Sequence, residues 1–437
     1  MSEPSSPAAQ AQWLGQPRGL SILFLTQMWE IFSYYGMRVL LVYYMTKQLR
    51  MGQQHASLVY GVYAATFYFT PILGGVVADR WLGKRRAVIL GAATMALGHF
   101  MMASESLLYP ALAAIALGNG LFLPSLPSQV EGLYARNDPR RDGAYNVYYV
   151  GINLGGLLAP LVCGTLGELY GWHWGFGAAG IGMLAGLAIY VLGGRYLPAE
   201  TRAAAPVAAG EPVSAAHDLR TRLWVLATIG LCVMLFRGAY EQVGNTIALW
   251  ADNGVDRHFG SRLIPMTWFQ AINPLLVIVL TPAYVAVWTR LGRLGREPAA
   301  AAKMALGASV VALAYALAAT VGATTAGAAP WPWLALFFCV LTAGELMILP
   351  IGLGLFARMA PARHRATTIA AWFFASFGGN LLAGALGMLW TRLSAPAFFA
   401  LMAAVAAASA LCLGLLAGPS RRIETGPAGR DGTGGGI

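Results

Sequence analysis

The stretch 20–46, LSILFLTQMWEIFSYYGMRVLLVYYMT, decides how the rest of the chain is interpreted. It is apolar and longer than the roughly 20 helical residues needed to cross a bilayer, yet it carries Glu30 and Arg38. A charged side chain at the centre of a membrane helix costs at least about 2.5 kcal/mol, so it must face water or a partner. We therefore expect one side of this helix to line a solute pathway whose other walls come from elsewhere in the chain.

The composition of the 437-residue chain is typical of a polytopic helical membrane protein. Hydrophobic residues make up 57% and charged residues only 11%, whereas ordinary soluble domains are about 25% charged. The sequence predicts an all-α protein with twelve membrane-spanning helices, at 20–46, 57–80, 86–103, 107–131, 142–167, 172–196, 222–250, 262–291, 300–325, 331–359, 365–392 and 396–417.

The placement of the charged residues indicates that the chain lies in a lipid bilayer and does not bind nucleic acid. A net charge of +11 could suit nucleic acid, but most of the 29 Lys and Arg residues lie in alternate loops, as the positive-inside rule expects. We therefore expect a multi-pass protein of the cytoplasmic (inner) membrane, with both termini cytoplasmic and no nucleic-acid partner. The four Cys and six His have no metal-ligand spacing, and no nucleophile–base pair or nucleotide-binding loop is present. We expect no metal, no cofactor and no enzymatic activity.

An Ala-, Pro- and Gly-rich segment, 197–221, divides the chain into six predicted helices on each side and is typical of a linker. The Gly-rich end of the chain is predicted to be disordered. The expected parts are a cytoplasmic N-terminal segment, a six-helix bundle, a cytoplasmic linker, a second six-helix bundle and a disordered cytoplasmic tail, at 1–19, 20–196, 197–221, 222–417 and 418–437.

Each half carries a related basic loop after its second predicted helix, ADRWLGKRR at 78–86 and VWTRLGRLGR at 287–296. Repeats of this kind are typical of transporters built from two similar halves. The first loop, extended to GGVVADRWLGKRR at 74–86, resembles the loop signature of the major facilitator superfamily. Asp79 at a cytoplasmic helix end could pair with basic groups and latch that side; the alternative is a solvated turn.

Dispersed stretches in both halves resemble the proton-dependent oligopeptide transporter (POT) family, a branch of that superfamily. They are FSYYGMR at 32–38, YYVGINLG at 148–155, YEQVGNT at 240–246, WFQAINPL at 268–275, and GELMILPIGLGLFARMAP at 344–361 followed by AAWFFASFGGNLLAG at 370–384. The resemblance implies a major facilitator fold of twelve helices in two six-helix bundles. It also implies import of di- and tripeptides together with protons.

A zwitterionic peptide needs a cation for its carboxylate, an anion for its amine, amides for its backbone and an aromatic-walled cavity. The resemblance implies that Glu345 meets the amine, that Asn153 and Asn273 assist, and that an Arg38–Glu241 pair forms an outer gate opened by protonation. Structural ion pairs, interhelical hydrogen bonds and core packing are the alternatives. The candidate substrate-binding residues are Tyr34, Tyr35, Arg38, Tyr68, Asn153, Arg237, Asn273, Glu345 and Trp372; the candidate coupling or gating residues are Glu30, Arg38, Asp79 and Glu241.

The chain departs from the family where coupling is expected. The family's first-helix motif Glu-x-x-Glu-Arg-Phe has Gln27 in place of its first acid and Ile31 in place of its arginine, and the lysine of the fourth helix is Leu123. Losing these charges together avoids an orphaned buried charge. Whether proton coupling survives the loss is left open.

A further departure is Arg237, which replaces a tryptophan one turn before Glu241. We hypothesise that Arg237 supplies cationic character to the cavity, by pairing with Glu30 or Glu345 or by meeting the peptide carboxylate.

The leading function is secondary active import of di- and tripeptides by alternating access and proton symport, by a protein acting as a monomer. The same fold could instead carry nitrate or another small anion, which the cations Arg38 and Arg237 favour and Glu345 opposes. A weakly coupled or uncoupled peptide exchanger is also compatible with the sequence. The missing charges further leave open a transport-deficient sensor or scaffold.

Overall fold

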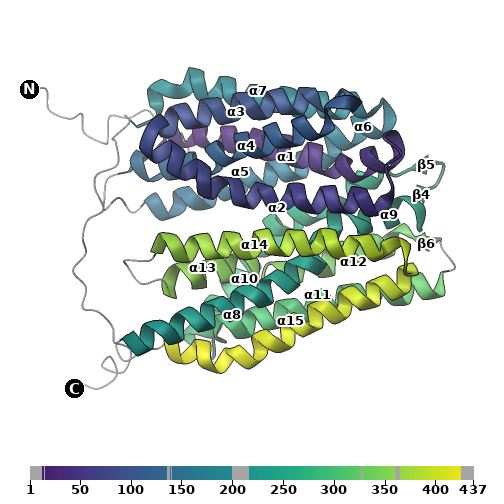
Figure 1. Ribbon diagram of the computed structural model, residues 1–437. Coiled ribbons are helices and arrows are strands. Elements are labelled where there is room, and N and C mark those ends of the chain that lie inside the picture. The colour runs from purple at the N-terminus through teal and green to yellow at the C-terminus, as the bar shows by residue number, and fades with distance from the viewer. Residues whose placement is uncertain are drawn as a thin grey trace, which may run out of the picture. The chain divides into compact units, whose positions relative to one another are not determined.

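The computed structural model describes residues 12–13, 15–134, 138, 140–198, 216–325, 328–359 and 365–424 (Figure 1). Among these residues, six two-residue strands form three short pairs, β1–β2, β3–β6 and β4–β5. Their bounds are Gln12–Trp13 (β1), Gln16–Pro17 (β2), Val255–Asp256 (β3), His258–Phe259 (β4), Arg262–Leu263 (β5) and Ala329–Pro330 (β6). The α-helices are Arg18–Tyr43 (α1), Gln53–Val77 (α2), Lys84–Met101 (α3), Leu108–Ser125 (α4), Arg140–Ala159 (α5), Thr165–Leu169 (α6), Trp172–Leu192 (α7), Ala216–Tyr240 (α8), Thr246–Asn253 (α9), Ile272–Arg293 (α10), Ala300–Thr324 (α11), Trp331–Glu345 (α12), Leu349–Met359 (α13), Arg365–Gly387 (α14) and Ala395–Glu424 (α15).

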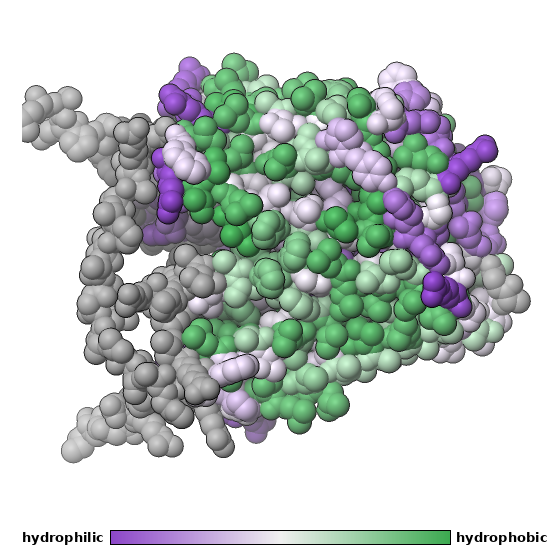
Figure 2. Space-filling model, in the orientation of Figure 1, coloured by the Kyte–Doolittle hydropathy of each residue, from purple (hydrophilic) through white to green (hydrophobic). Residues whose placement is uncertain are grey.

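Helical segments occupy all twelve predicted ranges, and the predicted all-α membrane fold is confirmed. Within the described residues, ten helical segments are long and apolar enough to cross a membrane. The first and third segments, α1 with its internal charges and α3 beginning with KRR at 84–86, are not among the ten. Figure 2 shows hydrophobic residues over the middle of the helices and hydrophilic residues near their ends, as expected where lipid replaces water.

The chain forms two compact units that largely follow the predicted halves. Unit 1 comprises Met1–Gly52, Thr66–Ala205 and Arg257–Ile278, and unit 2 comprises Gln53–Ala65, Pro206–Asp256 and Val279–Ile437. Two segments therefore belong to the unit that is formed mainly by the other half of the sequence. The first turns of α2 belong to unit 2, and the β4–β5 hairpin with the start of α10 belongs to unit 1.

Unit 1 packs α1 against α5 and α7, and α3 against α4 and α7. Its core contains fully buried Leu20, Leu23, Phe122 and Tyr190. Glycine allows α5 to approach α1 closely: a Cβ built at Gly155 would lie 2.2 Å from the carbonyl oxygen of Met28. Small residues at helix interfaces permit such backbone contact, and here they hold α5 against the polar stretch of α1.

Unit 2 packs α11 against α15 and α12, and α8 against α14 and α15. Aromatic rings fill its core, with centroids of Tyr315 and Phe337 5.2 Å apart and those of Trp250 and Phe399 5.1 Å apart. The first turns of α2 join this unit through the Ser57 hydroxyl, which donates to Asn245 Oδ1 at 2.7 Å.

Several membrane segments are interrupted near the candidate residues. The helix that begins as α8 changes at Glu241 to a 3₁₀ turn, Glu241–Gly244, before α9. The segment formed by α12 and α13 is interrupted directly after Glu345. A π-helical turn, Ala78–Leu82, extends α2 through Asp79. Broken helices of this kind are common at transporter binding sites because they leave backbone and side-chain groups facing a cavity.

Three predicted boundaries need correction. The predicted linker 197–221 is partly helical, because α8 begins at Ala216 and the stretch 216–221 contains neither Gly nor Pro. The predicted tail 418–437 begins inside α15, which continues to Glu424. Ser420 is buried there, so packing outweighs the helix-breaking tendency of Pro419.

The third correction concerns the predicted N-terminal segment 1–19. It contains the β1–β2 pair, and α1 begins within it at Arg18. The rest of the predicted linker, 199–215, and of the predicted disordered tail, 425–437, lies outside the described residues.

Candidate functional site

A buried polar chain begins at Glu30 in α1. Glu30 is fully buried, and Gln27 Nε2 donates to its Oε2 at 2.7 Å. The Tyr148 hydroxyl of α5 in turn donates to Gln27 Oε1. Within the described part of the chain, Glu30 Oε1 has no hydrogen-bond partner. The sequence singled out Glu30 as an acid at membrane depth, and its indirect link to Tyr148 was missed.

Four predicted residues of unit 1 gather around an aromatic platform. The Arg38 Cζ lies 5.9 Å from the ring centroid of Tyr34 and 5.7 Å from that of Tyr35, within cation–π range. Tyr34 stacks on Phe67 at 4.0 Å, and Phe67 meets Tyr68 edge-on at 5.8 Å. The motif SYYGMR therefore places a cation on a preformed aromatic surface.

The two predicted asparagines belong to the same unit. Asn153 on α5 is buried and donates through Nδ2 to the backbone carbonyl of Tyr149, 3.0 Å away. Asn273 is half-buried in the first turn of α10. A Cβ built at Gly156 would lie 3.5 Å from Pro274, so α5 and the start of α10 are neighbours. The amides thus occur on adjacent helices.

In unit 2, Arg237 and Glu241 form a buried ion pair. Arg237 Nη1 donates to Glu241 Oε1 at 2.7 Å, and the two side chains are 6% and 3% exposed. A Cβ built at Gly379 would lie 2.5 Å from Arg237 Cβ, so α14 covers the arginine closely. The partner of Arg237 in the structure is therefore Glu241, whereas the sequence hypothesis paired Arg237 with Glu30 or Glu345. The proposed pairing of Arg38 with Glu241 involves residues of different units and stays a prediction.

The other predicted residues of unit 2 lie at and beside the break between α12 and α13. Glu345 is the last residue of α12 and is half-buried. Trp372 of α14 is buried, with its ring 5.3 Å from that of Phe356 in an edge-on contact. A Cβ built at Gly352 would lie 2.4 Å from the Trp372 ring. The tryptophan is therefore held tightly against α13.

Asp79 lies apart from these groups, exposed in the π-helical turn Ala78–Leu82. The turn ends at Gly83, whose φ of 79° lies in the region that favours glycine. The predicted latch through Asp79 remains a prediction.

Sequence reasoning missed Glu168, at the end of α6. Its carboxylate accepts from the backbone N–H groups of Met266 and Thr267, both at 2.9 Å, and from the Thr267 hydroxyl at 2.6 Å. Arg257 Nη1 lies 4.0 Å from the same carboxylate. Glu168 therefore caps the 3₁₀ turn Met266–Ala271 that leads into α10 and Asn273. No local sequence signal joins residues this far apart.

The described residues contain no group of three or more His, Cys, Asp or Glu side chains that could hold a metal ion. The polar groups of the site are carboxylates, amides, guanidinium groups and aromatic hydroxyls. Such groups can bind a charged solute, and the carboxylates among them can take up and release protons.

Comparison with known proteins gives concordant matches. The POT family profile matches residues 85–209 and 207–401. The peptide transporter YePEPT of Yersinia enterocolitica subsp. palearctica is 33% identical over an alignment of 453 positions, which covers 86% of this chain and 88% of the relative. A di-/tripeptide transporter of Lactococcus lactis subsp. cremoris is 31% identical over an alignment of 462 positions, which covers 89% of this chain and 93% of that relative. The crystal structure of a peptide transporter in complex with sulfate matches with a TM-score of 0.88 at 29% identity, over 95% of this chain and 98% of that one.

Proposed function

Because this chain belongs to the POT family of membrane transport proteins, we propose that it imports di- and tripeptides across the cytoplasmic membrane together with protons. The relatives named as peptide transporters support the substrate class, and the Lactococcus relative is named for di- and tripeptides. The chain carries out transport and is not an enzyme.

The observation that carries this proposal is the presence of both signs of charge inside otherwise apolar helices. Unit 1 offers the Arg38 guanidinium on its aromatic platform, and unit 2 offers the half-buried Glu345 carboxylate beside a helix break. A peptide with a free carboxylate and a free amine complements one cation and one anion. Asn153 and Asn273 would supply amides for its backbone.

Proton coupling is assigned to two buried acids, Glu241 and Glu30. Glu241 is held by Arg237, and the Glu30 carboxylate accepts from the neutral amide of Gln27. Protonating Glu241 would remove the attraction that holds Arg237 and free the arginine for another partner, such as the peptide carboxylate. This exchange of partners would link proton entry to peptide binding.

Arg237 is given a direct role in this cycle. Undiminished peptide binding by Arg237→Ala would contradict that role. The latch through Asp79 is proposed to operate on the cytoplasmic side of the membrane.

The orientation follows from the positive-inside rule. Both termini are proposed to be cytoplasmic, and the protein is proposed to work as a monomer by alternating access of two helical bundles. Accessibility labelling, in intact cells, of single cysteines introduced at each end of the chain tests the orientation.

The decisive experiment measures uptake of labelled dialanine by proteoliposomes, with and without an inward proton gradient. Accumulation that requires the gradient supports symport. Exchange of dialanine without accumulation would identify an uncoupled peptide exchanger. Absence of movement of any di- or tripeptide would overturn the peptide assignment.

The same vesicles test nitrate as the cargo. Nitrate transport would be favoured by unopposed buried cations, but Arg237 has a carboxylate 2.7 Å away, so the pair carries no net charge. We expect no nitrate uptake and no inhibition of dialanine uptake by millimolar nitrate. Saturable nitrate uptake in the absence of peptide transport would favour the anion carrier.

A further inference from the structure

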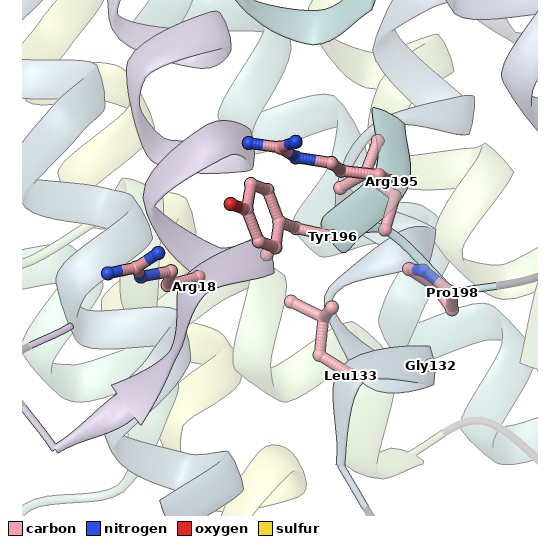
Figure 3. A pocket seen from close by; sticks show the side chains of 8 residues that line it. Arg18, Gly132, Leu133, Arg195, Tyr196 and Pro198 are labelled. Carbon is pink, nitrogen blue, oxygen red and sulfur yellow. The ribbon is translucent and has the colours of Figure 1, made fainter. Parts of the chain in front are cut away.

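A small cavity lies beside the first turn of α1 in unit 1. Its volume is about 220 Å³, and its lining includes Arg18, Leu133, Arg195 and Tyr196 (Figure 3). Arg18 precedes Glu30 by twelve residues, or about 18 Å of helix, so the cavity is separate from the polar chain at Glu30. No part of the transport proposal uses it.

Two arginines converge on one ring in this cavity. The Cζ atoms of Arg195 and Arg18 lie 4.8 Å and 5.8 Å from the ring centroid of Tyr196. Figure 3 shows the Tyr196 hydroxyl turned toward the side where both guanidinium groups end. The ring face stabilises the cations, and the hydroxyl adds a hydrogen-bonding group beside them.

Within the described residues, the acidic partners of Arg140 and Arg141 distinguish these arginines from Arg18 and Arg195. Arg140 pairs with Asp138 at 2.7 Å, and its hydrogen bonds hold the pKa of that carboxyl below its usual range. Arg141 pairs with Glu131 at 2.5 Å. In the part of the chain that the structure describes, neither Arg18 nor Arg195 has a carboxylate partner. No acid of the described residues therefore compensates these two positive charges at the cavity.

The start of α1 adds to the positive potential. Pro17 precedes the helix without a side-chain cap, so the positive end of the helix dipole faces the same region. Gly19 holds the geometry: a Cβ there would lie 2.5 Å from the Tyr196 carbonyl oxygen and 2.4 Å from Leu133. Tyr196 is thus packed directly against the first turn of α1.

The cavity lies at a boundary between apolar and polar chain. Tyr196 is the last residue of the candidate membrane span Trp172–Tyr196, and Arg18 is the first residue of α1. Arg and Tyr at such boundaries meet lipid headgroups, whose phosphates accept bidentate hydrogen bonds from guanidinium. The volume is below the roughly 300 Å³ of a typical small-molecule site, which suits a headgroup phosphate better than a whole solute.

We propose that this cavity binds a phosphate group through Arg18 and Arg195, with the phosphate of an anionic phospholipid as the favoured source and free phosphate as the other. Arg195 and Arg18 would each donate to phosphate oxygens, and the Tyr196 hydroxyl would donate a further hydrogen bond. Bound lipid would tie the start of α1 to the turn after α7.

The test uses the full chain purified in a neutral detergent and measures its thermal unfolding during titrations. The probes are dihexanoyl phosphatidylglycerol, dihexanoyl phosphatidylcholine and inorganic phosphate. We expect a saturable rise in Tm with phosphatidylglycerol, whose apparent Kd increases at least about tenfold in the double variant R18Q/R195Q. Saturation by phosphatidylglycerol alone identifies lipid as the source. Competition by millimolar inorganic phosphate identifies the free ion as a ligand as well.

A matched control removes two other arginines from a helix end. Arg290 and Arg293 are exposed in the last turn of α10, so R290Q/R293Q makes the same change in net charge. Unchanged affinity in R18Q/R195Q, or an equal loss in R290Q/R293Q, would overturn the proposal. If the double variant does not fold, the single variant R195Q decides the test, and its apparent Kd for phosphatidylglycerol should increase about threefold. Y196F should keep most of the affinity because it retains the ring.

Discussion

The guanidinium of Arg237 donates a hydrogen bond to the carboxylate of Glu241 across 2.7 Å, within unit 2 and almost fully shielded from solvent. The two residues are one helical turn apart, so the helix itself sets their separation. Each charge compensates the desolvation of the other, and removal of either one leaves the remaining charge buried.

This pairing predicts a specific pattern of stabilities. R237Q and E241Q should each lower the free energy of unfolding by about 3–5 kcal/mol, because each leaves one buried charge uncompensated. The double variant R237Q/E241Q should be more stable than either single variant. Thermal unfolding of the purified protein measures all four forms, and strictly additive effects of the two substitutions would contradict the pairing.

Substitution of Glu241 is expected to abolish proton coupling while peptide exchange continues. In E241Q the amide cannot take up a proton, so gradient-driven accumulation of dialanine should fall to the level without a gradient, while exchange of labelled for unlabelled dialanine persists. The control is E105Q, which removes an exposed carboxylate that accepts from Gln48. Normal accumulation by E241Q would assign coupling to another residue, with Glu30 the next to be changed.

Glu168 predicts a local effect at the start of α10. In E168Q one carboxylate oxygen becomes an amide nitrogen, which cannot accept a hydrogen bond, so at least one N–H of Met266 or Thr267 loses its acceptor. Loss of such a bond to a charged group is worth about 1.5–3 kcal/mol. Hydrogen exchange of the segment that includes these two amides should accelerate about tenfold or more. Unaltered exchange there, with folding intact, would show that the cap does not hold this turn.

Two glycines, Gly61 and Gly384, are expected to tolerate no added side-chain atom at their contact. A Cβ built at Gly61 would lie 2.4 Å from the Gly384 Cα, backbone against backbone, within unit 2. G61A should therefore lower the free energy of unfolding by about 1–3 kcal/mol through overpacking. G177A is the matched control, because Gly177 lies in α7 and, apart from its own stretch of helix, no described atom lies within 4 Å of its built Cβ. Equal Tm values for the two variants would contradict the close approach.

Much of the fold was predictable because membrane spans are decided by long apolar runs, which a single sequence displays directly. The boundaries at Ala216 and Glu424 were not, because the helices continue past composition that is usual for linkers and tails. Pro419 within α15 is the clearest case: a local breaker is tolerated where the following residue is buried.

The candidate site was predictable to the extent that charge at membrane depth is unusual. Glu30, Arg237 and Glu241 stand out in any apolar segment, and the structure buries all three. Their partners were harder to predict. Arg237 and Glu241 have the spacing of a within-helix pair. The family resemblance instead favoured Arg38 as the partner of Glu241, and Arg237 was hypothesised to pair with Glu30 or Glu345. The contact between Glu168 and Thr267 joins residues 99 positions apart, and only the folded chain reveals it.

The exchange of segments between the units bears on how this chain could be divided. Residues Gln53–Ala65 lie in the first half of the sequence but pack with unit 2, and Arg257–Ile278 lie in the second half but pack with unit 1. Two polypeptides separated within 197–221 would each carry a piece of the other's core. Neither fragment should fold alone, whereas co-expressed fragments should complement each other and assemble into a functional pair.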